Sequence, residues 1–341
     1  MSDRTPDIAV VKKALRVACR APSLHNSQPW HWVFDGHALR LFVDRHRLVN
    51  VADRSGRETI ISCGAVLNHA RIAMAAAGWQ ANIDRFPDPE SRDHLATMVF
   101  RPLDCVTESQ RSLAESILER RTDRLPLRRP TYWRWLLPEL LKALDAGIVM
   151  LDEISDEARP RLARASRLTE VLHCGDASYQ AELHWWTAPF ALYEGVPPAT
   201  LATASEAARV DVRRDFPVVS SLDRHRNNEV DRSKILVLST TDDSRSSVLG
   251  SGEVLSRLLL ECTMAGMATC TLTHLIELDE SRDIVRCLIS QRGEPQALIR
   301  VGIAPPMEQL PAATPRLPMD EVLEISCPVR QTDARDSDLA P

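Results

Sequence analysis

A short pattern that occurs twice constrains the fold of this 341-residue chain more than any other feature. Residues 63–67 (C-G-A-V-L) and 77–78 (A-G) recur as residues 251–255 (S-G-E-V-L) and 265–266 (A-G). One offset, 188 residues, relates the two copies at Gly, Val, Leu, Ala and Gly. A fixed offset between similar segments is the mark of an internal repeat, although a string this short can also recur by chance. We expect each copy to be a buried helix of about four turns that starts with small residues and ends at glycine.

Strand patterns flank both copies and favour two related halves. Two alternating apolar stretches, 31–34 and 39–43, are joined by Asp35-Gly36, which is a strong hairpin signal. Helical spacing of apolar residues predicts a further helix at 107–120, with Thr107 as its N-cap. The other expected elements are a helix at 7–20 and strands near 81–86, 95–101, 234–239 and 297–301.

Composition indicates a soluble globular protein. Apolar residues make up 44% and charged residues 26% of the chain, and the net charge of −5 gives no reason to expect nucleic-acid binding. No apolar run reaches the roughly 20 residues of a membrane span, and the N-terminus lacks a signal-peptide pattern. The eight cysteines form no C-x-x-C pair, and no H-E-x-x-H motif suggests a metal. We expect a cytoplasmic protein that binds no metal, membrane or nucleic acid.

Residues 21–30 (A-P-S-L-H-N-S-Q-P-W) form a segment rich in side chains that can bind a planar heterocycle. Pro22 and Pro29 bracket it and prevent it from continuing the preceding helix. Hydroxyl and amide groups between them, such as those of Ser23 and Asn26, can donate and accept hydrogen bonds. An ordinary turn is the alternative, because Ser, Asn and Pro are common turn residues.

Residues 120–124 (R-R-T-D-R) provide the donors that a phosphate requires. A phosphate group carries close to two negative charges and three acceptor oxygens, which arginine matches well. These arginines could instead complement the dipole of the helix that ends there, or form a solvated basic face. A nucleic-acid patch is a further alternative, but no aromatic residues are interleaved with the arginines.

Three motifs together carry a resemblance to a known family. Residues 21–30 resemble the P-S-x-x-N-x-Q-P-W loop of flavin-dependent nitroreductases, and residues 120–124 resemble their R-R-S-x-R signature. Residues 311–322 (P-A-A-T-P-R-L-P-M-D-E-V) are similar to the family ending K-x-R-x-P-x-x-E-V. Within the superfamily, the combination resembles the two-repeat, mycobacterial Acg-like branch. The resemblance implies an α+β nitroreductase-like fold of mixed sheets flanked by helices, with two halves fused as a pseudo-dimer around FMN.

The resemblance also implies which residues would hold FMN. The loop would contact the ring, the arginine signature would hold the phosphate, and the residues after the second repeat helix would line one face of the ring. His274 stands where the family often has Gly, which would restrict hydride access, and Thr314 stands where many members have Lys. No catalytic residue is implied. The expected cofactor-binding residues are Pro22, Ser23, Leu24, Asn26, Arg120, Arg121, Thr122, Arg124, Glu182, Thr271, Leu272, Thr273, His274, Thr314 and Arg316.

The chain divides into an expected first half (1–105), a second half (106–327) and a disordered tail (328–341). Each motif occurs once, so we expect one flavin per chain, a collapsed second pocket, and a monomer that acts as an internal pseudo-dimer. Residues 178–231 have no counterpart in a short nitroreductase and could form a lid. The protein would then shield or store FMN with weak or absent reductase turnover. The alternative is an active NAD(P)H-dependent oxidoreductase that reduces nitroaromatics or quinones.

Overall fold

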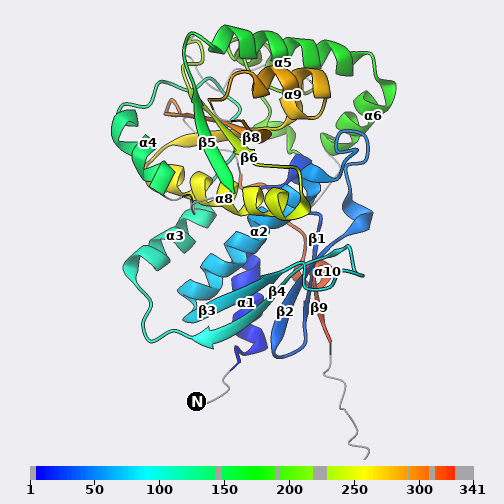
Figure 1. The fold of residues 1–341 in the computed structure, drawn as a ribbon, viewed down its shortest axis with the longest axis vertical. Helices are drawn as coiled ribbons and strands as arrows, with labels where there is room; N and C mark the ends of the chain where they lie inside the picture. Colours follow the sequence, from blue (N-terminus) through cyan, green and yellow to red (C-terminus); the bar gives the residue numbers. More distant parts are fainter. Residues whose placement is uncertain are drawn as a thin grey trace, which may run out of the picture.

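Two β-sheets lie on opposite sides of a central pair of long helices (Figure 1). The computed structural model describes residues 5–142, 144, 148–188, 193–217, 229–290, 292–306 and 312–326. The expected tail at 328–341 falls outside the described residues. The fold is α+β, as the sequence predicts.

The first sheet is mixed and has the order β3-β4-β2-β1-β9. Strands β1 to β4 pair antiparallel, whereas β9 comes from the far end of the chain and runs parallel to β1. The expected hairpin is confirmed: the Asp35 carboxylate accepts hydrogen bonds from the His37 and Ala38 amides and closes the turn. The strands are β1 (Trp30–Phe34), β2 (Ala38–Val43), β3 (Trp79–Arg85), β4 (His94–Pro102) and β9 (Leu323–Ile325).

The second sheet repeats the connectivity of β1 to β4. Its order is β5-β6-β8-β7 with antiparallel pairs, and a single parallel bridge joins Thr122 to Thr269. In both sheets two strands precede a long helix, two follow it, and the third strand in sequence lies at the edge beside the fourth. The strands are β5 (Val149–Ile154), β6 (Lys234–Thr240), β7 (Ala268–Leu272) and β8 (Glu294–Gly302).

The two repeat helices pack directly against each other. They are α2 (Arg57–Ala76) and α8 (Arg245–Met264), so both ends keep the sequence offset. The expectation that each begins near its first glycine was wrong, because Gly64 and Gly252 lie inside the helices. A Cβ atom on Gly64 would collide with the Leu249 carbonyl oxygen, and one on Gly252 with that of Ile61. Glycine is therefore needed for close approach of the two backbones, and the contact is symmetric.

The chain leaves the second half in a long excursion between β5 and β6. It spans residues 155–233, so it starts earlier than the insert at 178–231 that the sequence suggested. In the first half the equivalent strands are joined by a short hairpin. The excursion contains α5 (Arg159–Cys174), α6 (Ala177–Trp186), η3 (Pro198–Thr200) and α7 (Ala204–Ala208).

The remaining helices include two that the sequence predicted well. Helix α1 (Ile8–Ala18) is capped by the Asp7 carboxylate, which accepts from the Ala9 amide at 2.7 Å. Helix α3 (Glu108–Glu119) starts at a reciprocal capping box between Thr107 and Gln110. The others are η1 (Leu24–Asn26), η2 (Arg45–Arg47), α4 (Trp133–Lys142), η4 (His274–Ile276), α9 (Asp279–Arg286) and α10 (Met319–Val322).

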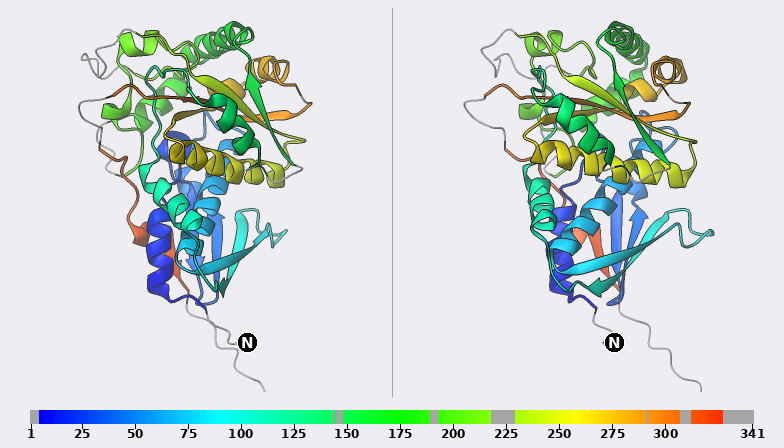
Figure 2. Two further views of the ribbon diagram at one scale, coloured as in Figure 1. Left: turned by 90° about the vertical axis from the view of Figure 1, so that its left-hand side faces the viewer. Right: turned by 60° about the vertical axis from the view of Figure 1, so that its left-hand side comes forward.

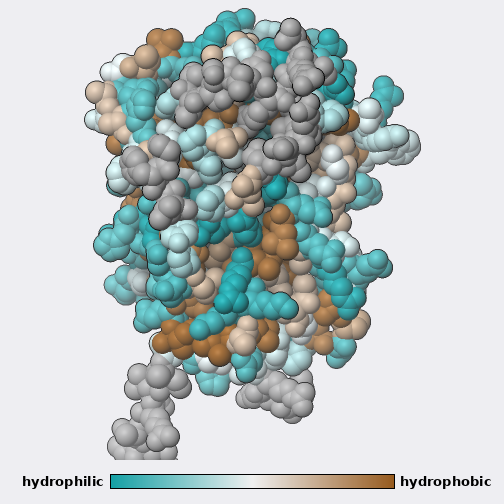
Figure 3. All heavy atoms as spheres, turned by 180° about the vertical axis from the view of Figure 1, so that it is seen from behind, coloured by the Kyte–Doolittle hydropathy of each residue, from teal (hydrophilic) through white to brown (hydrophobic). Residues whose placement is uncertain are grey.

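The C-terminal arm, residues 312–326, returns to the first half and runs along α1 before it ends in β9 (Figure 2). The division at residue 105 is therefore not a clean domain boundary. Among the described helices, α2 alone has the length and composition of a membrane span, but 78% of that window is buried inside the protein. Seen from behind, the surface mixes polar and hydrophobic side chains (Figure 3).

Candidate functional site

Two adjoining cavities lie where the loop after α1 meets the second half. The inner cavity, of about 400 Å³, lies between this loop, α2, β7 and the excursion. The basic cavity, of about 530 Å³, lies between the loop, residues 118–125 and the C-terminal arm. Pro22, Ser23, Thr122 and Arg124 line both, so the two cavities adjoin along these residues. Each volume falls in the range typical of small-molecule sites, about 300–1,000 Å³.

The loop after α1 holds an unusual backbone conformation. His25, Asn26 and Gln28 have φ values of 49°, 58° and 52°, in the left-handed region. The Gln28 side chain is fully buried, donates to the Tyr193 carbonyl at 2.7 Å and accepts from the Leu317 amide at 3.0 Å. The excursion and the C-terminal arm therefore hold the loop in its strained conformation, which is common at binding sites.

Arginines gather around the basic cavity. Arg20, Arg120, Arg121, Arg124 and Arg316 line it, together with Glu119 and Asp123. Arg120 is 8% exposed, and among the described residues its Nε has no hydrogen-bond partner. Burial and then the charge of Arg20 lower its pKa to about 10. Cations held this close favour an anion between them, because an opposite charge relieves their repulsion.

Arg316 lines the basic cavity and also holds the C-terminal arm in place. Its guanidinium donates to backbone carbonyls throughout: those of Cys19, Arg20 and Ala21 after α1, and those of Thr314 and Pro315 in its own arm. It lines the basic cavity but also ties the arm to the end of α1. Arg20, which the sequence analysis did not select, lies in the same cavity and donates to the Thr314 carbonyl at 2.8 Å.

The segment after β7 meets the inner cavity as far as residue 273 and then turns away. Thr271, Leu272 and Thr273 line the cavity, as the sequence analysis expected. His274 does not belong to the lining: it is fully buried and its Nε2 lies 2.8 Å from Ser166 Oγ on α5. Burial and then the charge of Arg214 lower the pKa of His274 to about 3, so the ring is neutral. His274 therefore packs behind the wall and does not restrict the cavity itself.

Glu182 also lies elsewhere than expected. Its carboxylate accepts hydrogen bonds from the Val51 amide at 3.0 Å and the Ala52 amide at 2.9 Å. It belongs to neither cavity lining. The reason is that α6 packs on the loop before α2, where Glu182 fixes the excursion to the first half.

The excursion, which the sequence analysis suggested as a lid, supplies lining residues of the inner cavity that it did not name. Ala202, Ala204 and Ala207 line it from η3 to α7, and Arg213–Phe216 continue the lining. The Arg124 guanidinium carbon lies 5.2 Å from the centre of the Phe216 ring. This distance suits a cation–π contact, which joins the excursion to the arginine signature. No sequence motif marks these residues.

A buried ion pair stands beside the same wall. Arg214 donates to Glu277 and to the Tyr179 hydroxyl, and to Thr273 Oγ1 at 3.2 Å. Burial opposes the ionisation of Glu277, but Arg214 and His173 outweigh it and lower its pKa to about 2. Glu58 of α2 lines the cavity close to this pair.

On the opposite side of the helix pair the equivalent place is filled. Glu253 stands 188 residues after Ala65, and Arg85 binds its two carboxylate oxygens at 2.7 and 2.8 Å. Next to this pair, the Arg245 guanidinium carbon lies 5.2 Å from the centre of the Phe86 ring. At the position that corresponds to Ala65, the second repeat helix therefore carries an acid held in an ion pair.

The chain shares most of its length with several mycobacterial proteins. It is 53% identical over 325 residues to a Mycobacterium tuberculosis protein named "Putative NAD(P)H nitroreductase acg", covering 95% of this chain and 98% of the relative. It is 60% identical over 320 residues to an uncharacterized protein of the same species, with 93% of each chain covered. A nitroreductase structure from Anabaena variabilis has a TM-score of 0.46 at 9% identity, covering 86% of this chain and 73% of that one.

A nitroreductase with bound FMN from Bacteroides fragilis has a TM-score of 0.36 at 12% identity, covering 60% of this chain and 97% of that one. No family model matches the sequence. Family membership therefore follows from the mycobacterial relatives, whose identity extends over nearly the whole of both chains. The protein belongs to the Acg family of nitroreductase-like proteins.

Proposed function

We propose that the protein binds one FMN per chain, with the phosphate in the basic cavity and the ring in the inner cavity. The observation that carries this proposal is that the two cavities adjoin and share four lining residues. Five arginines line the basic cavity, whereas the inner cavity combines small, hydroxyl and apolar groups with arginines such as Arg214 and Arg300, which Glu277 and Asp231 already hold in ion pairs. A flavin mononucleotide has the same division into a charged end and a planar ring. Among the residues that the structure describes, the Arg120 Nε has no partner and suits the phosphate, and the buried Asn26 Oδ1 also has none and suits a donor of the ribityl chain.

A bound flavin would supply electron transfer, as hydride or as single electrons. The chain's own residues would bind and orient it: Arg120 and Arg20 at the phosphate, and Thr271–Thr273 along the ring cavity. The strained loop at 22–28 would close the site from the first half. We infer that the two halves act together as a fused pseudo-dimer within a cytoplasmic monomer, since the matching sheets and the symmetric helix contact support this arrangement.

We further propose that the excursion acts as a lid that shields the flavin and keeps reductase turnover weak or absent. Residues 202–216 form part of the cavity wall, and hydride transfer needs close approach of the nicotinamide to the ring. The names of the relatives favour the alternative, an active NAD(P)H-dependent reductase of nitroaromatics or quinones. The position of His274 also favours it, because this side chain does not restrict the cavity.

The absorption spectrum of the purified protein tests both parts of the proposal. We expect a yellow protein that releases one FMN per chain and loses its colour slowly under anaerobic NADPH. Rapid bleaching would support the reductase instead, and two flavins per chain would contradict the fused arrangement. A protein that binds no flavin would overturn the proposal as a whole.

A substitution in the excursion tests the lid directly. Replacing residues 198–208 with a Gly/Ser segment of equal length removes three lining alanines but keeps Asp231, which is buried and pairs with Arg300 at 2.6 Å. We expect FMN to remain bound and its reduction by NADPH to become faster. An unchanged rate in a folded, flavin-loaded variant would show that this segment only packs on the body.

A further inference from the structure

Glu58 is a buried acid that faces the inner cavity without a counter-ion. Its side chain belongs to the first turn of α2 and lines the cavity, and the residue is only 3% exposed. Among the described residues, neither carboxylate oxygen has a hydrogen-bond partner. A buried carboxyl group left without partners is costly when ionised, and more so when other anions lie near it.

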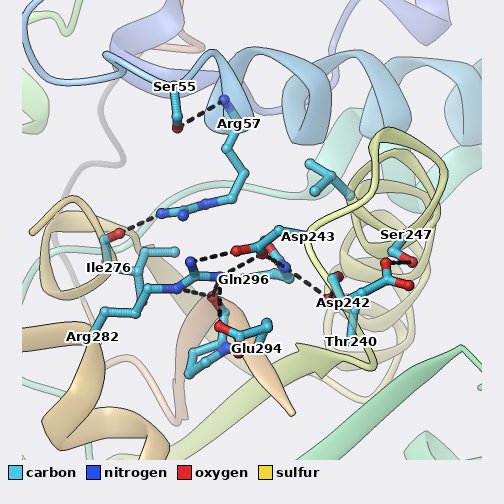
Figure 4. Close-up of polar contacts among 12 residues, drawn as sticks. Ser55, Arg57, Thr240, Asp242, Asp243, Ser247, Ile276, Arg282, Glu294 and Gln296 are labelled. Carbon is cyan, nitrogen blue, oxygen red and sulfur yellow. Dashed lines mark hydrogen bonds and ion pairs between the residues drawn. The ribbon is translucent and has the colours of Figure 1, made fainter. Parts of the chain in front are cut away.

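The nearby cations are engaged with other groups. Arg214 is held by Glu277 and Tyr179, and Arg57 extends to the Ile276 carbonyl (Figure 4). Beyond Arg57, Arg282 pairs with Asp243 at 2.6 Å, so this cation is also neutralised (Figure 4). Arg214 and Arg282 are therefore balanced by other acids, and the Arg57 guanidinium is turned toward a backbone carbonyl.

The nearby anions act in the opposite direction. Asp53 caps the start of α2, where it accepts from the Glu58 amide at 3.1 Å and the Thr59 amide at 2.7 Å. Glu277 is ionised in its pair with Arg214. Burial, and then the charges of Glu277 and Asp53, raise the pKa of Glu58 well above its ordinary value, although Arg214 and Arg57 oppose the shift. These surroundings favour the neutral acid at neutral pH.

We propose that Glu58 is a neutral carboxylic acid that donates a hydrogen bond to the heterocycle bound in the inner cavity. This inference rests on the proposed function for the identity of the ring, but not for the state of the acid. A protonated carboxyl group presents an O–H donor beside a C=O acceptor. It can therefore meet the carbonyl and imide N–H groups of a flavin, whereas a carboxylate could only accept. Glu58 would position the ring from the first half, opposite the lining at 271–273.

Infrared difference spectroscopy tests the state of the acid without any ligand. We expect the parent protein to show the C=O stretch of a protonated carboxyl group at neutral pH, and Glu58→Gln to lack it. Glu170→Gln is the matched control, because burial raises the pKa of Glu170, on α5, to about 7. No band difference between the parent and Glu58→Gln would overturn the proposal.

Riboflavin binding then tests the hydrogen bond, and it avoids the charge of the phosphate. We expect Glu58→Gln to bind riboflavin within about twofold of the parent, because the amide keeps a donor and an acceptor, and Glu58→Leu to bind about tenfold more weakly. The infrared band should shift when riboflavin binds to the parent. Equal weakening in the Gln and Leu variants, or an unmoved band, would overturn the proposal. If neither riboflavin nor FMN bound to the parent, the flavin proposal would fail, while the band would still report on Glu58.

Discussion

The two sides of the central helix pair have the same backbone design but different contents. On one side α2 presents Ala65 beside the inner cavity; on the other α8 presents Glu253, which Arg85 holds in a two-point ion pair. The glycines at the centre make equivalent contacts in both directions. The difference teaches that two halves with the same strand order and the same central helix contact can differ in their chemistry through a few side chains.

The contact between α2 and α8 at Gly64 and Gly252 should be the part of the molecule most sensitive to substitution. Because a Cβ on Gly64 or Gly252 would meet a backbone carbonyl of the facing helix, Gly64→Ala and Gly252→Ala should each lower the free energy of unfolding by about 3 kcal/mol. Chemical denaturation of the two variants would measure it. Similar losses are expected from both, since the contact is symmetric; a loss from only one would break the comparison.

Gly250→Ala provides the matched control on the same helix. A Cβ at this position meets no atom within 4 Å. The substitution should raise the free energy of unfolding by about 0.5–1 kcal/mol, because alanine favours helix more than glycine does. If Gly250→Ala also lowered the free energy of unfolding, the losses in the Gly64 and Gly252 variants would have to be explained by reduced backbone flexibility and not by the close approach of the two helices.

The arginines of the basic cavity make one side of the central helix pair chemically different from the other. Arg120→Gln should weaken FMN binding by about tenfold or more, because it removes a buried charged contact, and leave riboflavin binding nearly unchanged. Isothermal titration of both ligands would measure this. Arg111→Gln, on an exposed part of α3, is the control and should change neither affinity. Equal losses for FMN and riboflavin would show that Arg120 supports the fold rather than the phosphate.

The excursion is fixed over one side only, and Arg47 is part of its attachment. The Arg47 guanidinium binds Glu194 of the excursion at 2.8 Å and Glu321 of the C-terminal arm at 2.9 Å. Arg47 also pairs with Asp44 at 3.2 Å. In Arg47→Ala, loss of the pair with Glu194, worth up to about 1 kcal/mol, should raise the open population and speed flavin reduction by NADPH about fivefold. Stopped-flow absorbance would measure the rate. Arg45→Ala breaks only an exposed pair with Asp93 and should leave the rate unchanged.

The smallest effects are expected from substitutions on the side of the helix pair that holds the Arg85–Glu253 ion pair. Arg85→Ala removes an ion pair in which the arginine side chain is 40% exposed, so the free energy of unfolding should fall by less than about 1 kcal/mol. Neither this variant nor Glu253→Ala should bind a second flavin, because the arginine signature and the strained loop occur once. A second bound flavin in either variant would show that the filled side still contains a complete site.

Local sequence signals predicted the local structure well. The helix at 7–20, the Asp35-Gly36 hairpin and the Thr107 N-cap each depend on neighbouring residues, so a pattern could reveal them. The three motifs that the sequence analysis assigned to one site contribute residues 22–24, Thr122, Arg124 and residues 271–273 to the lining of a common cavity; that they bind FMN stays a prediction. The two repeat helices were expected, but their starts were not, because Gly64 and Gly252 lie inside the helices and their sequence pattern does not distinguish this from a position at a helix start.

The remaining features depend on contacts between distant parts of the chain. Strand β5 went unrecognised because the excursion separates it from its partner β6. The binding of Arg316 to the carbonyls after α1 reflects where the arm returns, which no local pattern records. Glu58 was missed for a related reason: its chemistry follows from the partners that it lacks among the described residues.

The crossing of β9 into the first sheet has a consequence for synthesis of the chain on the ribosome. Strand β1 (Trp30–Phe34) is made long before its neighbour at residues 323–325. At about 5–20 residues per second, the edge of β1 waits on the order of ten seconds or more for its partner. Unpaired edges of this kind invite association with other chains. Residues 1–105 expressed alone would keep that edge open permanently, so the N-terminal half should aggregate where the full chain does not.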